Sequence, residues 1–328
     1  MKPTPLLLAL HLFAATSYTL PLPDDAAVDL VWQFPNTTWI ENLAVRHTGE
    51  ILCTSLSAAA IFMVDPFAHT EVTVVQFEAG NGVLGITEVE SDVFVVVTAR
   101  VDLATSEAAP GSAAAWKVDM KAWMLGAPNV VTLVANLTDV GLPDGVVPLT
   151  EPDTVLIADA AQGLIWKLST RTGEYTIVLD DDILRSHNPH LPLGVDGLHI
   201  LDKSLYFTNL GDNIFARVAI DTTLGNATDQ IEIVATLPFP DDFALAADGT
   251  AYVVGANQLS RVSPAGTVEV LAGGVNDTTL EGATSAQFGR RRGDAGVLYI
   301  GTNGGLLVPV HGRLIGGQIL AVNVAQFE

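Results

Sequence analysis

The chain has few basic residues and a single cysteine. Its 328 residues include 15 Lys+Arg against 37 Asp+Glu, which gives a formal net charge of −22. Nucleic acid and anionic membrane surfaces both attract basic proteins, so this balance argues against either partner. Because Cys53 is the only cysteine, neither a disulfide nor a multi-thiolate metal site forms within one chain. Cys53 lies in the strand-like run 51–54 and is predicted to be a buried, unreactive side chain.

Several catalytic motifs and long hydrophobic runs are also missing. The sequence has no Gly-x-Ser-x-Gly nucleophile elbow, no Gly-rich phosphate loop and no Cys-rich zinc pattern. After the N-terminus no stretch of about 18 apolar residues occurs, so we expect a protein without a membrane span. Charged residues make up 16% of the chain and hydrophobic residues 49%, a composition that excludes disorder and predicts a large core.

Residues 1–17 have the pattern of a secretory signal peptide. Lys2 supplies a positive charge, Leu6–Leu12 begins an apolar segment, and Ala15–Ser17 offers the small residues that a signal peptidase reads. We therefore expect the mature protein to comprise residues 18–328 and to be secreted or to stay in the lumen of the secretory pathway. A core strand at the N-terminus is the alternative interpretation.

Four glycosylation sequons support this route. They begin at Asn36, Asn136, Asn226 and Asn276, and each is expected to mark a surface loop. A secreted chain without disulfides needs another source of stability, and a closed ring of β-sheets with a large core provides one.

A weak internal repeat runs through the sequence. Each unit begins with a short apolar or acidic opening, continues through a polar turn and ends in a β-rich run, and the units recur at roughly 40–60 residues, a spacing typical of propeller blades. The six units begin at Glu41, Leu84, Pro143, Val195, Pro240 and Thr284. Period-2 alternation prevails and long helical patterns are absent, so the sequence predicts a six-bladed all-β propeller in one domain. Closure is expected to pair Val28–Phe34 with a strand within Leu306–Val324.

The register of the repeat predicts where function lies. The opening of each unit precedes the innermost strand of a blade, so the openings should converge on one mouth of the central channel. Five side chains from different blades are then expected there, and the second unit contributes Gly85 in the same place: Glu41, Asp144, Asp196, Asp241 and Thr284.

Three segments carry a resemblance to a known family. They are Trp39–Arg46, Gly197–Asn209 and Thr284–Arg290, and Leu298-Tyr299 and Thr302–Gly305 extend the likeness over nearly the whole mature chain. The sequence resembles the regucalcin/gluconolactonase superfamily of six-bladed propellers. It is more closely similar to a secreted fungal branch that includes the hetero-Diels–Alderases of tropolone–sesquiterpenoid biosynthesis.

The resemblance implies a candidate metal site and a candidate reaction. Lactonases of the superfamily hold one divalent cation by a Glu, an Asn and an Asp, and the matching residues here are Glu41, Asp196 and Asp241. Asp196 replaces the Asn, and the Arg and Asn that hold a sugar lactone are not found. The fungal cyclases instead join a quinone methide, formed from a hydroxymethyl tropolone or phenol, to a humulene-type alkene. That activity requires no cofactor, whereas the lactonase activity implies calcium or another divalent cation such as zinc.

Three functions therefore stay open. The first is a cycloaddition catalyst acting on terpene and polyketide-type substrates, with an apolar pocket that orients two reactants. Its expected catalytic residues are Glu41, Asp196, Asn209, Asp241 and Thr284, and its expected binding residues are Trp39, Asn42, Asp144, Phe243, Ser285, Phe288 and Asn303. The second is a metal-dependent lactone hydrolase using Glu41, Asp196 and Asp241. The third is a binding propeller without catalysis.

Local alternatives accompany these assignments. Trp39, Phe243 and Phe288 are either pocket walls or blade-packing core residues. Asp144 and Asp196 precede glycines, so their carboxylates could instead cap their own turns. His199 follows the opening of the fourth unit and either reaches the mouth or packs within the sheet.

Overall fold

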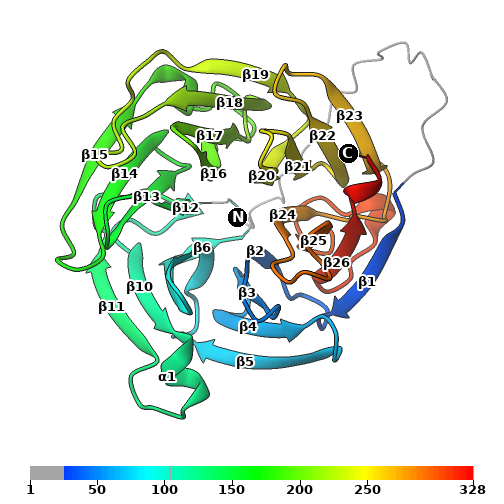
Figure 1. Cartoon of the computed structure of the whole chain (residues 1–328), viewed down its shortest axis with the longest axis horizontal. Helices are drawn as coiled ribbons and strands as arrows, with labels where there is room; N and C mark the ends of the chain where they lie inside the picture. Colours follow the sequence, from blue (N-terminus) through cyan, green and yellow to red (C-terminus); the bar gives the residue numbers. More distant parts are fainter. Residues whose placement is uncertain (1–25, 104, 106, 328) are drawn as a thin grey trace, which may run out of the picture.

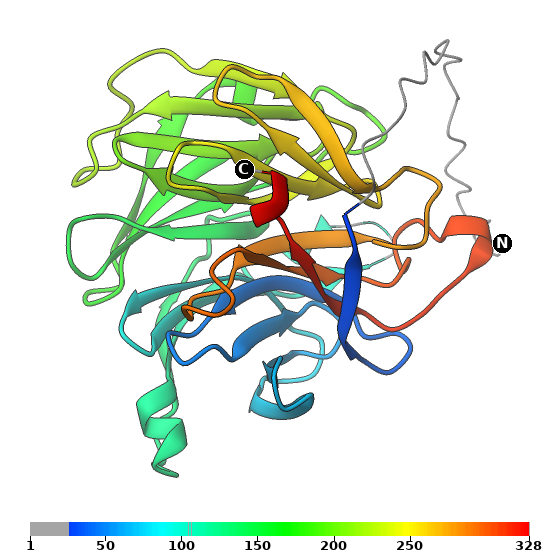
Figure 2. The same ribbon diagram turned by 45° about the vertical axis from the view of Figure 1, so that its right-hand side comes forward.

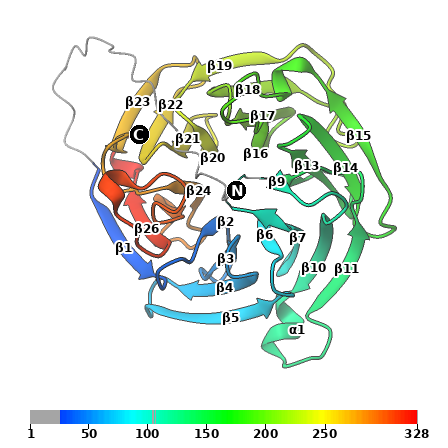
Figure 3. The same cartoon turned by 180° about the vertical axis from the view of Figure 1, so that it is seen from behind.

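Six four-stranded antiparallel sheets are arranged as blades around a common axis (Figure 1). The computed structural model describes residues 26–103, 105 and 107–327. The same ring is visible from behind in Figure 3, with the inner strands at the centre and the outer strands on the rim. The predicted six-bladed propeller is confirmed.

The first three blades follow one another along the chain. Blade 1 contains β2 (Ile40–Val45), β3 (Ile51–Ser55), β4 (Ala60–Asp65) and β5 (Thr70–Gln76). Blade 2 contains β6 (Gly82–Glu90), β7 (Val93–Ala99), β10 (Ala114–Asp119) and β11 (Val131–Asn136). Blade 3 contains β12 (Pro143–Pro148), β13 (Thr154–Asp159), β14 (Leu164–Ser169) and β15 (Tyr175–Asp180).

The remaining blades complete the ring. Blade 4 contains β16 (Val195–Leu201), β17 (Ser204–Asn209), β18 (Ile214–Ala219) and β19 (Glu232–Thr236). Blade 5 contains β20 (Pro240–Leu245), β21 (Ala251–Gly255), β22 (Gln258–Val262) and β23 (Val268–Gly273). Blade 6 contains β24 (Ala283–Phe288), β25 (Val297–Thr302), β26 (Gln318–Asn323) and β1 (Val28–Gln33).

Ring closure joins the two ends of the described chain. β1 pairs antiparallel with β26, in a register that places Val28 opposite Val322 and Gln33 opposite Gln318. The blue and red strands lie side by side in Figure 1. The predicted closure is confirmed, and it gives β26 a hydrogen-bonded partner where an open sheet would leave a free edge.

Short elements interrupt the blades. β8 (Val101–Asp102) and β9 (Glu107–Ala108) form a hairpin between β7 and β10. Helix α1 (Met120–Met124) follows β10, is capped by the Asp119 carboxylate, and projects from the rim in Figure 2. Three 3₁₀ turns are η1 (Asp182–Leu184), η2 (Val310–Gly312) and η3 (Ala325–Phe327). Among the described residues, no helix is long and apolar enough to cross a membrane.

The core lies between neighbouring blades. β3 and β13 are buried along their whole length, because a middle strand packs against a neighbouring sheet on each face. Between blades 3 and 4, for example, Leu156 and Ile165 share a cluster with Leu205 and Phe207. The outer strands are mostly exposed or half-buried, and Val31 is the one buried residue of β1. The predicted large core is therefore distributed around the ring.

Every inner strand bulges near its start. In blade 1 the ladder skips from Ile40 to Leu43, and the corresponding skip in blade 3 is from Pro143 to Val146. The skip leaves two successive residues outside the regular ladder in blades 1–5 and one in blade 6. A bulge redirects side chains, and these bulges lie where the sequence predicted the mouth.

The second bulge residue is glycine in three consecutive blades because the next inner strand is very close. A Cβ on Gly85 would lie 2.1 Å from the Asp144 carbonyl oxygen, and one on Gly145 would lie 2.4 Å from that of Asp196. This register also corrects one expectation. Gly85 occupies the second bulge position, and Leu84 takes the first position, which blade 1 fills with Glu41.

Gly85→Ala is expected to destabilise the protein by about 1–3 kcal/mol, because the added methyl group would push two backbones apart. Denaturant unfolding measures the change. Gly293→Ala is the matched control, since nothing lies within 4 Å of a Cβ there. Equal stability of the two variants would contradict this reading of the blade spacing.

Candidate functional site

Four acidic side chains from four blades gather where the inner strands begin. Glu41, Asp144 and Asp196 are buried, with 9%, 8% and 5% exposure, and Asp241 is half-buried. Asp242, the next residue on β20, is also buried and acts electrostatically on Glu41, Asp144 and Asp241. We call Glu41, Asp144, Asp196, Asp241 and Asp242 the carboxyl cluster.

Burial and mutual repulsion favour protonated carboxyls in this cluster. Burial raises the pKa of Asp144 to about 7; a hydrogen bond with Asp196 lowers it and the Asp242 charge raises it. The pKa of Glu41 is raised well above its ordinary value by burial and by Asp144, against the hydrogen bond from the Trp39 indole. Within the described part of the chain, no lysine or arginine forms an ion pair with any member of the carboxyl cluster.

The pKa values of Asp196 and Asp241 are also raised well above their ordinary values. Burial is the largest cause of both shifts, followed by the charge of Asp144 for Asp196 and the charge of Glu41 for Asp241. The hydrogen bond between Asp144 and Asp196 raises the pKa of Asp196 and lowers that of Asp144, so Asp196 is the donor. Burial and mutual repulsion thus favour the protonated form of Glu41, Asp144, Asp196 and Asp241, and a protonated carboxyl can act as a general acid.

Asp242 is the member of the carboxyl cluster that is hydrogen-bonded to Asn42 and His199. Its carboxylate accepts hydrogen bonds from the Phe243 backbone N–H at 2.8 Å, from Asn42 Nδ2 at 3.2 Å and from His199 Nε2 at 3.2 Å. Asn42 belongs to blade 1 and Asp242 to blade 5, so this contact crosses the inner strand of blade 6. Asp242 was not among the predicted site residues, although its place next to Asp241 in the sequence could have indicated it.

A cavity lies along the later part of the inner strands. Two adjoining spaces of about 280 and 370 Å³ share Ile86, Thr87, His199, Ile200 and Gln287. Asn42 and Asp242 line the smaller space, and Phe288 and Arg290 line the larger. We call these joined spaces the channel cavity. Of the predicted binding residues, Asn42 and Phe288 line it.

Other predicted site residues stabilise loops or pack in the core. Both ends of the Asn209 amide bind loop backbone: Nδ2 donates to the Ile183 and Arg185 carbonyls, and Oδ1 accepts from Asp212 N–H. Phe243 is 0% exposed and packs edge-on against Phe215, with ring centroids 5.0 Å apart. Phe243 therefore packs in the core, and the Asn209 amide is bonded to the backbone of the preceding loop and of Asp212.

The remaining predicted residues lie around the start of β24 and at Trp39. Thr284 Oγ1 donates to the Ile40 carbonyl at 3.0 Å and thereby joins blades 6 and 1. Ser285 is fully buried, and its hydroxyl has no hydrogen-bond partner among the described residues. Asn303 Oδ1 accepts from Gly305 N–H. Trp39 is buried and contacts the cluster directly through Glu41.

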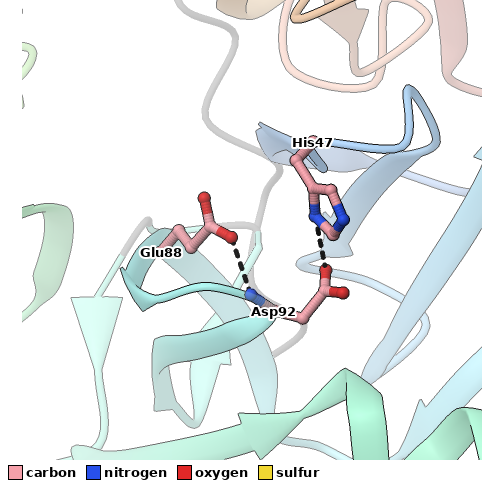
Figure 4. A group of neighbouring side chains, drawn as sticks. All are labelled: His47, Glu88 and Asp92. Atoms are coloured by element: carbon pink, nitrogen blue, oxygen red, sulfur yellow. Dashed lines mark hydrogen bonds and ion pairs between the residues drawn. The ribbon is translucent and has the colours of Figure 1, made fainter.

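A group of side chains at metal-ligand distances lies away from the expected ligands. In the described ranges, the group of three ligand atoms lying within 4.8 Å of one another is His47, Glu88 and Asp92 (Figure 4), not Glu41, Asp196 and Asp241. That group already has cationic partners. Arg46 makes two hydrogen bonds to Asp92, at 2.9 and 3.0 Å, and Arg290 pairs with Glu88. These pairs join blades 1, 2 and 6 and leave the group poorly suited to a cation.

Comparisons with solved structures agree with the ring geometry. A calcium-binding regucalcin from Agrobacterium tumefaciens covers 91% of this chain and 94% of its own, with a TM-score of 0.64 at 13% identity. The gluconolactonase XC5397 from Xanthomonas campestris covers 92% and 90%, with a TM-score of 0.64 at 12% identity. At these identities the likeness shows the fold alone.

Sequence comparison adds two curated relatives. A Phoma sp protein named "Putative hetero-Diels-Alderase" is 29% identical over 313 residues, which is 87% of this chain and 88% of the relative. A protein with the same description, asR5 from Sarocladium schorii, is 29% identical over 318 residues, or 85% and 78%. The resemblance predicted from the sequence is confirmed. No family model matches the chain.

Proposed function

We propose that this protein is a cyclase that catalyses a hetero-Diels–Alder reaction. The observation that carries the proposal is the sequence similarity to two proteins of that name over most of their length. As substrates we propose a quinone methide, made from a hydroxymethyl tropolone or phenol, and a humulene-type sesquiterpene alkene. The coarse activity rests on the relatives, and the substrates rest on the resemblance described above.

The carboxyl cluster supplies the acid–base chemistry that this reaction needs. A protonated carboxyl, for which we propose half-buried Asp241, gives its proton to the hydroxymethyl oxygen as the C–O bond breaks and water leaves. A neighbouring carboxylate takes the proton of the ring hydroxyl, so one proton is donated and one accepted. Cycloaddition then forms one C–C and one C–O bond without further proton transfer, and holding the two reactants in place supplies the remaining rate enhancement.

The test is turnover of a hydroxymethyl phenol with humulene by the purified protein. We expect one enantiomer of the adduct, formed faster than the racemic background reaction. Racemic adduct at the background rate would overturn the proposal. The control is the same protein denatured by heat.

The carboxyl cluster supports a second candidate, a metal-dependent lactone hydrolase. Carboxylate oxygens are ligands that calcium accepts, and a cation would offset the repulsion that raises these pKa values. Glu41, Asp196 and Asp241 would hold it, and the metal would polarise a lactone carbonyl. Stoichiometric bound metal, together with chelator-sensitive hydrolysis of a model lactone and no cycloadduct, would favour this candidate over the first.

We also propose that the protein follows the secretory pathway. The predicted signal peptide, residues 1–17, lies outside the described residues. Support comes from the asparagines of the four sequons, all of which are exposed: Asn36, Asn136, Asn226 and Asn276. Treatment of the protein from its native source with an endoglycosidase should increase its gel mobility. Unchanged mobility would argue against glycosylation at these positions.

A further inference from the structure

The turn that joins β24 to β25 in blade 6 contains three successive arginines, Arg290, Arg291 and Arg292. No other lysine or arginine in the sequence lies next to another one. The chain carries a net charge of −22, so a run of three positive charges is a local exception. Proteases that cleave after basic residues recognise them through acidic pockets, and two adjacent arginines fill two such pockets.

The peptide bond between Arg292 and Gly293 is accessible. Residues 290–293 are all exposed, and nothing lies within 4 Å of a Cβ built on Gly293. In the part of the chain that the structure describes, neither Arg292 nor Gly293 is hydrogen-bonded. Exposed loop tips with small residues are preferred sites of proteolytic nicking. Cleavage of this bond would therefore remove no hydrogen bond from the fold.

Arg291 is held more firmly than Arg292. Its guanidinium lies over the Phe67 ring, 4.5 Å from the ring centroid. Its backbone N–H donates to Asp294 Oδ1 at 2.7 Å, and its carbonyl accepts the Asp294 N–H at 3.1 Å. A protease binds its substrate as an extended segment, so this turn must open locally before it is cleaved. The contact with Phe67 should therefore slow cleavage.

The strand order of blade 6 would keep the two products of such a cleavage together. The order is β1-β26-β25-β24, and these four strands share one blade in Figure 1. The product that begins at Gly293 contains β25 and β26, whereas β24 and β1 belong to the other product. β25 pairs with β24 and β26 pairs with β1. The smaller product is thus hydrogen-bonded along both of its edges.

Buried side chains add to this retention. Leu298 and Ile300 of β25 and Leu320 of β26 are part of one core cluster with Tyr252 and Leu259 of blade 5. Release of the smaller product would expose this cluster to water, and burial of apolar surface is the main force that opposes it. The ring should therefore stay closed after the chain is cut.

We propose that the turn 289–296 is a processing site, at which an endoprotease specific for paired basic residues cleaves the chain without opening the ring. Arg291 and Arg292 enter two acidic pockets of the protease. Water is added across the peptide bond, so that Arg292 gains a terminal carboxylate and Gly293 a terminal amine. The meeting of the two proteins in the cell rests on the proposed secretory route, whereas the cleavage itself depends neither on that route nor on the cyclase activity.

The test is incubation of the folded protein with kexin, an endoprotease that cleaves after paired basic residues. Mass spectrometry should detect one product that ends at Arg292 and one that begins at Gly293. Size-exclusion chromatography under native conditions should show both products at the elution volume of the uncut protein. Arg291→Gln leaves no adjacent basic pair and should abolish cleavage, whereas Arg171→Gln, at an exposed turn position, should be cleaved as fast as the wild-type protein.

Phe67→Ala tests the opening of the turn. Loss of an exposed cation–π contact corresponds to about a two- to fivefold change in an equilibrium, so we expect cleavage to become faster by about that factor. Phe67 is 51% exposed, so its replacement should leave the fold intact. An uncleaved wild-type protein, equal cleavage of Arg291→Gln, or separation of the two products under native conditions would overturn the proposal.

Discussion

Asp241→Asn is expected to lower kcat of the proposed cycloaddition by about 10²–10⁴-fold, the range for loss of a general acid. The amide has the same shape as the carboxyl but cannot protonate the leaving hydroxyl group. KM should change much less, because the side chain keeps its size. Steady-state kinetics with the hydroxymethyl substrate measures both values.

Asp229→Asn is the matched control for this prediction. Asp229 is exposed, and its carboxylate contacts the neighbouring Gln230 N–H. We expect its kcat to equal that of the wild-type protein. A preformed quinone methide gives a sharper comparison, since it bypasses dehydration: Asp241→Asn should then recover most of its rate. An equal loss with both substrates would place Asp241 outside the dehydration step.

The second large effect concerns stability against pH. The pKa of Asp144 is raised from 3.8 to about 7 in the folded protein, mainly by burial, so between these values the folded state binds more protons than the unfolded state. Stability from this group is therefore present at low pH and lost as pH rises through the folded pKa. For Asp144 alone, the free energy of unfolding should fall by roughly 2–3 kcal/mol between about pH 5 and about pH 8.

Urea unfolding at several pH values tests this expectation. Glu41, Asp196 and Asp241 shift in the same direction, so they should add to the decline. Asp144→Asn has no titrating group at this position and should show a shallower decline than the wild-type protein. A wild-type stability that rises over the same range would mean that the cluster is ionised or holds a cation.

The blades could be predicted from the sequence because each one repeats a simple pattern. Period-2 alternation and turn residues marked the strands, and the unpaired segment Val28–Phe34 indicated how the ring closes. The hairpin β8–β9 and helix α1 were not predicted. Both are short insertions within blade 2, and neither has a counterpart in the other units of the sequence repeat.

The site was harder to predict because the bulges change which side chains face the channel. The sequence pattern gave Gly85 the position in blade 2 that Glu41 has in blade 1. The strand pairing gives that position to Leu84. Asp241 was selected from the repeat register and the family resemblance, and neither of these pointed to its neighbour Asp242. Asp241 and Asp242 both lie in the bulge of β20, and this bulge is visible only in the pairing of the strands.

Core and loop roles depend on long-range contacts that no short motif contains. Asn209 ends a strand, a common place for a binding residue, yet it stabilises the loop at Ile183 and Arg185. Phe243 lies beside the carboxyl cluster in sequence, but it packs between Phe215 and His199. Which side of the strand each residue occupies is decided by the neighbouring blade.

The pairing of β1 with β26 has a consequence for synthesis on the ribosome. The first strand of the ring, β1, is translated before blades 1–5, but its partner β26 is translated after them. At about 5–20 residues per second, β1 waits roughly 15–60 s for β26. During that interval blade 6 is incomplete, and Leu30, which stays 53% exposed even after folding, is available to chaperones. Completion of the ring is thus set by the time needed to translate the intervening blades as well as by the chemistry of the strands.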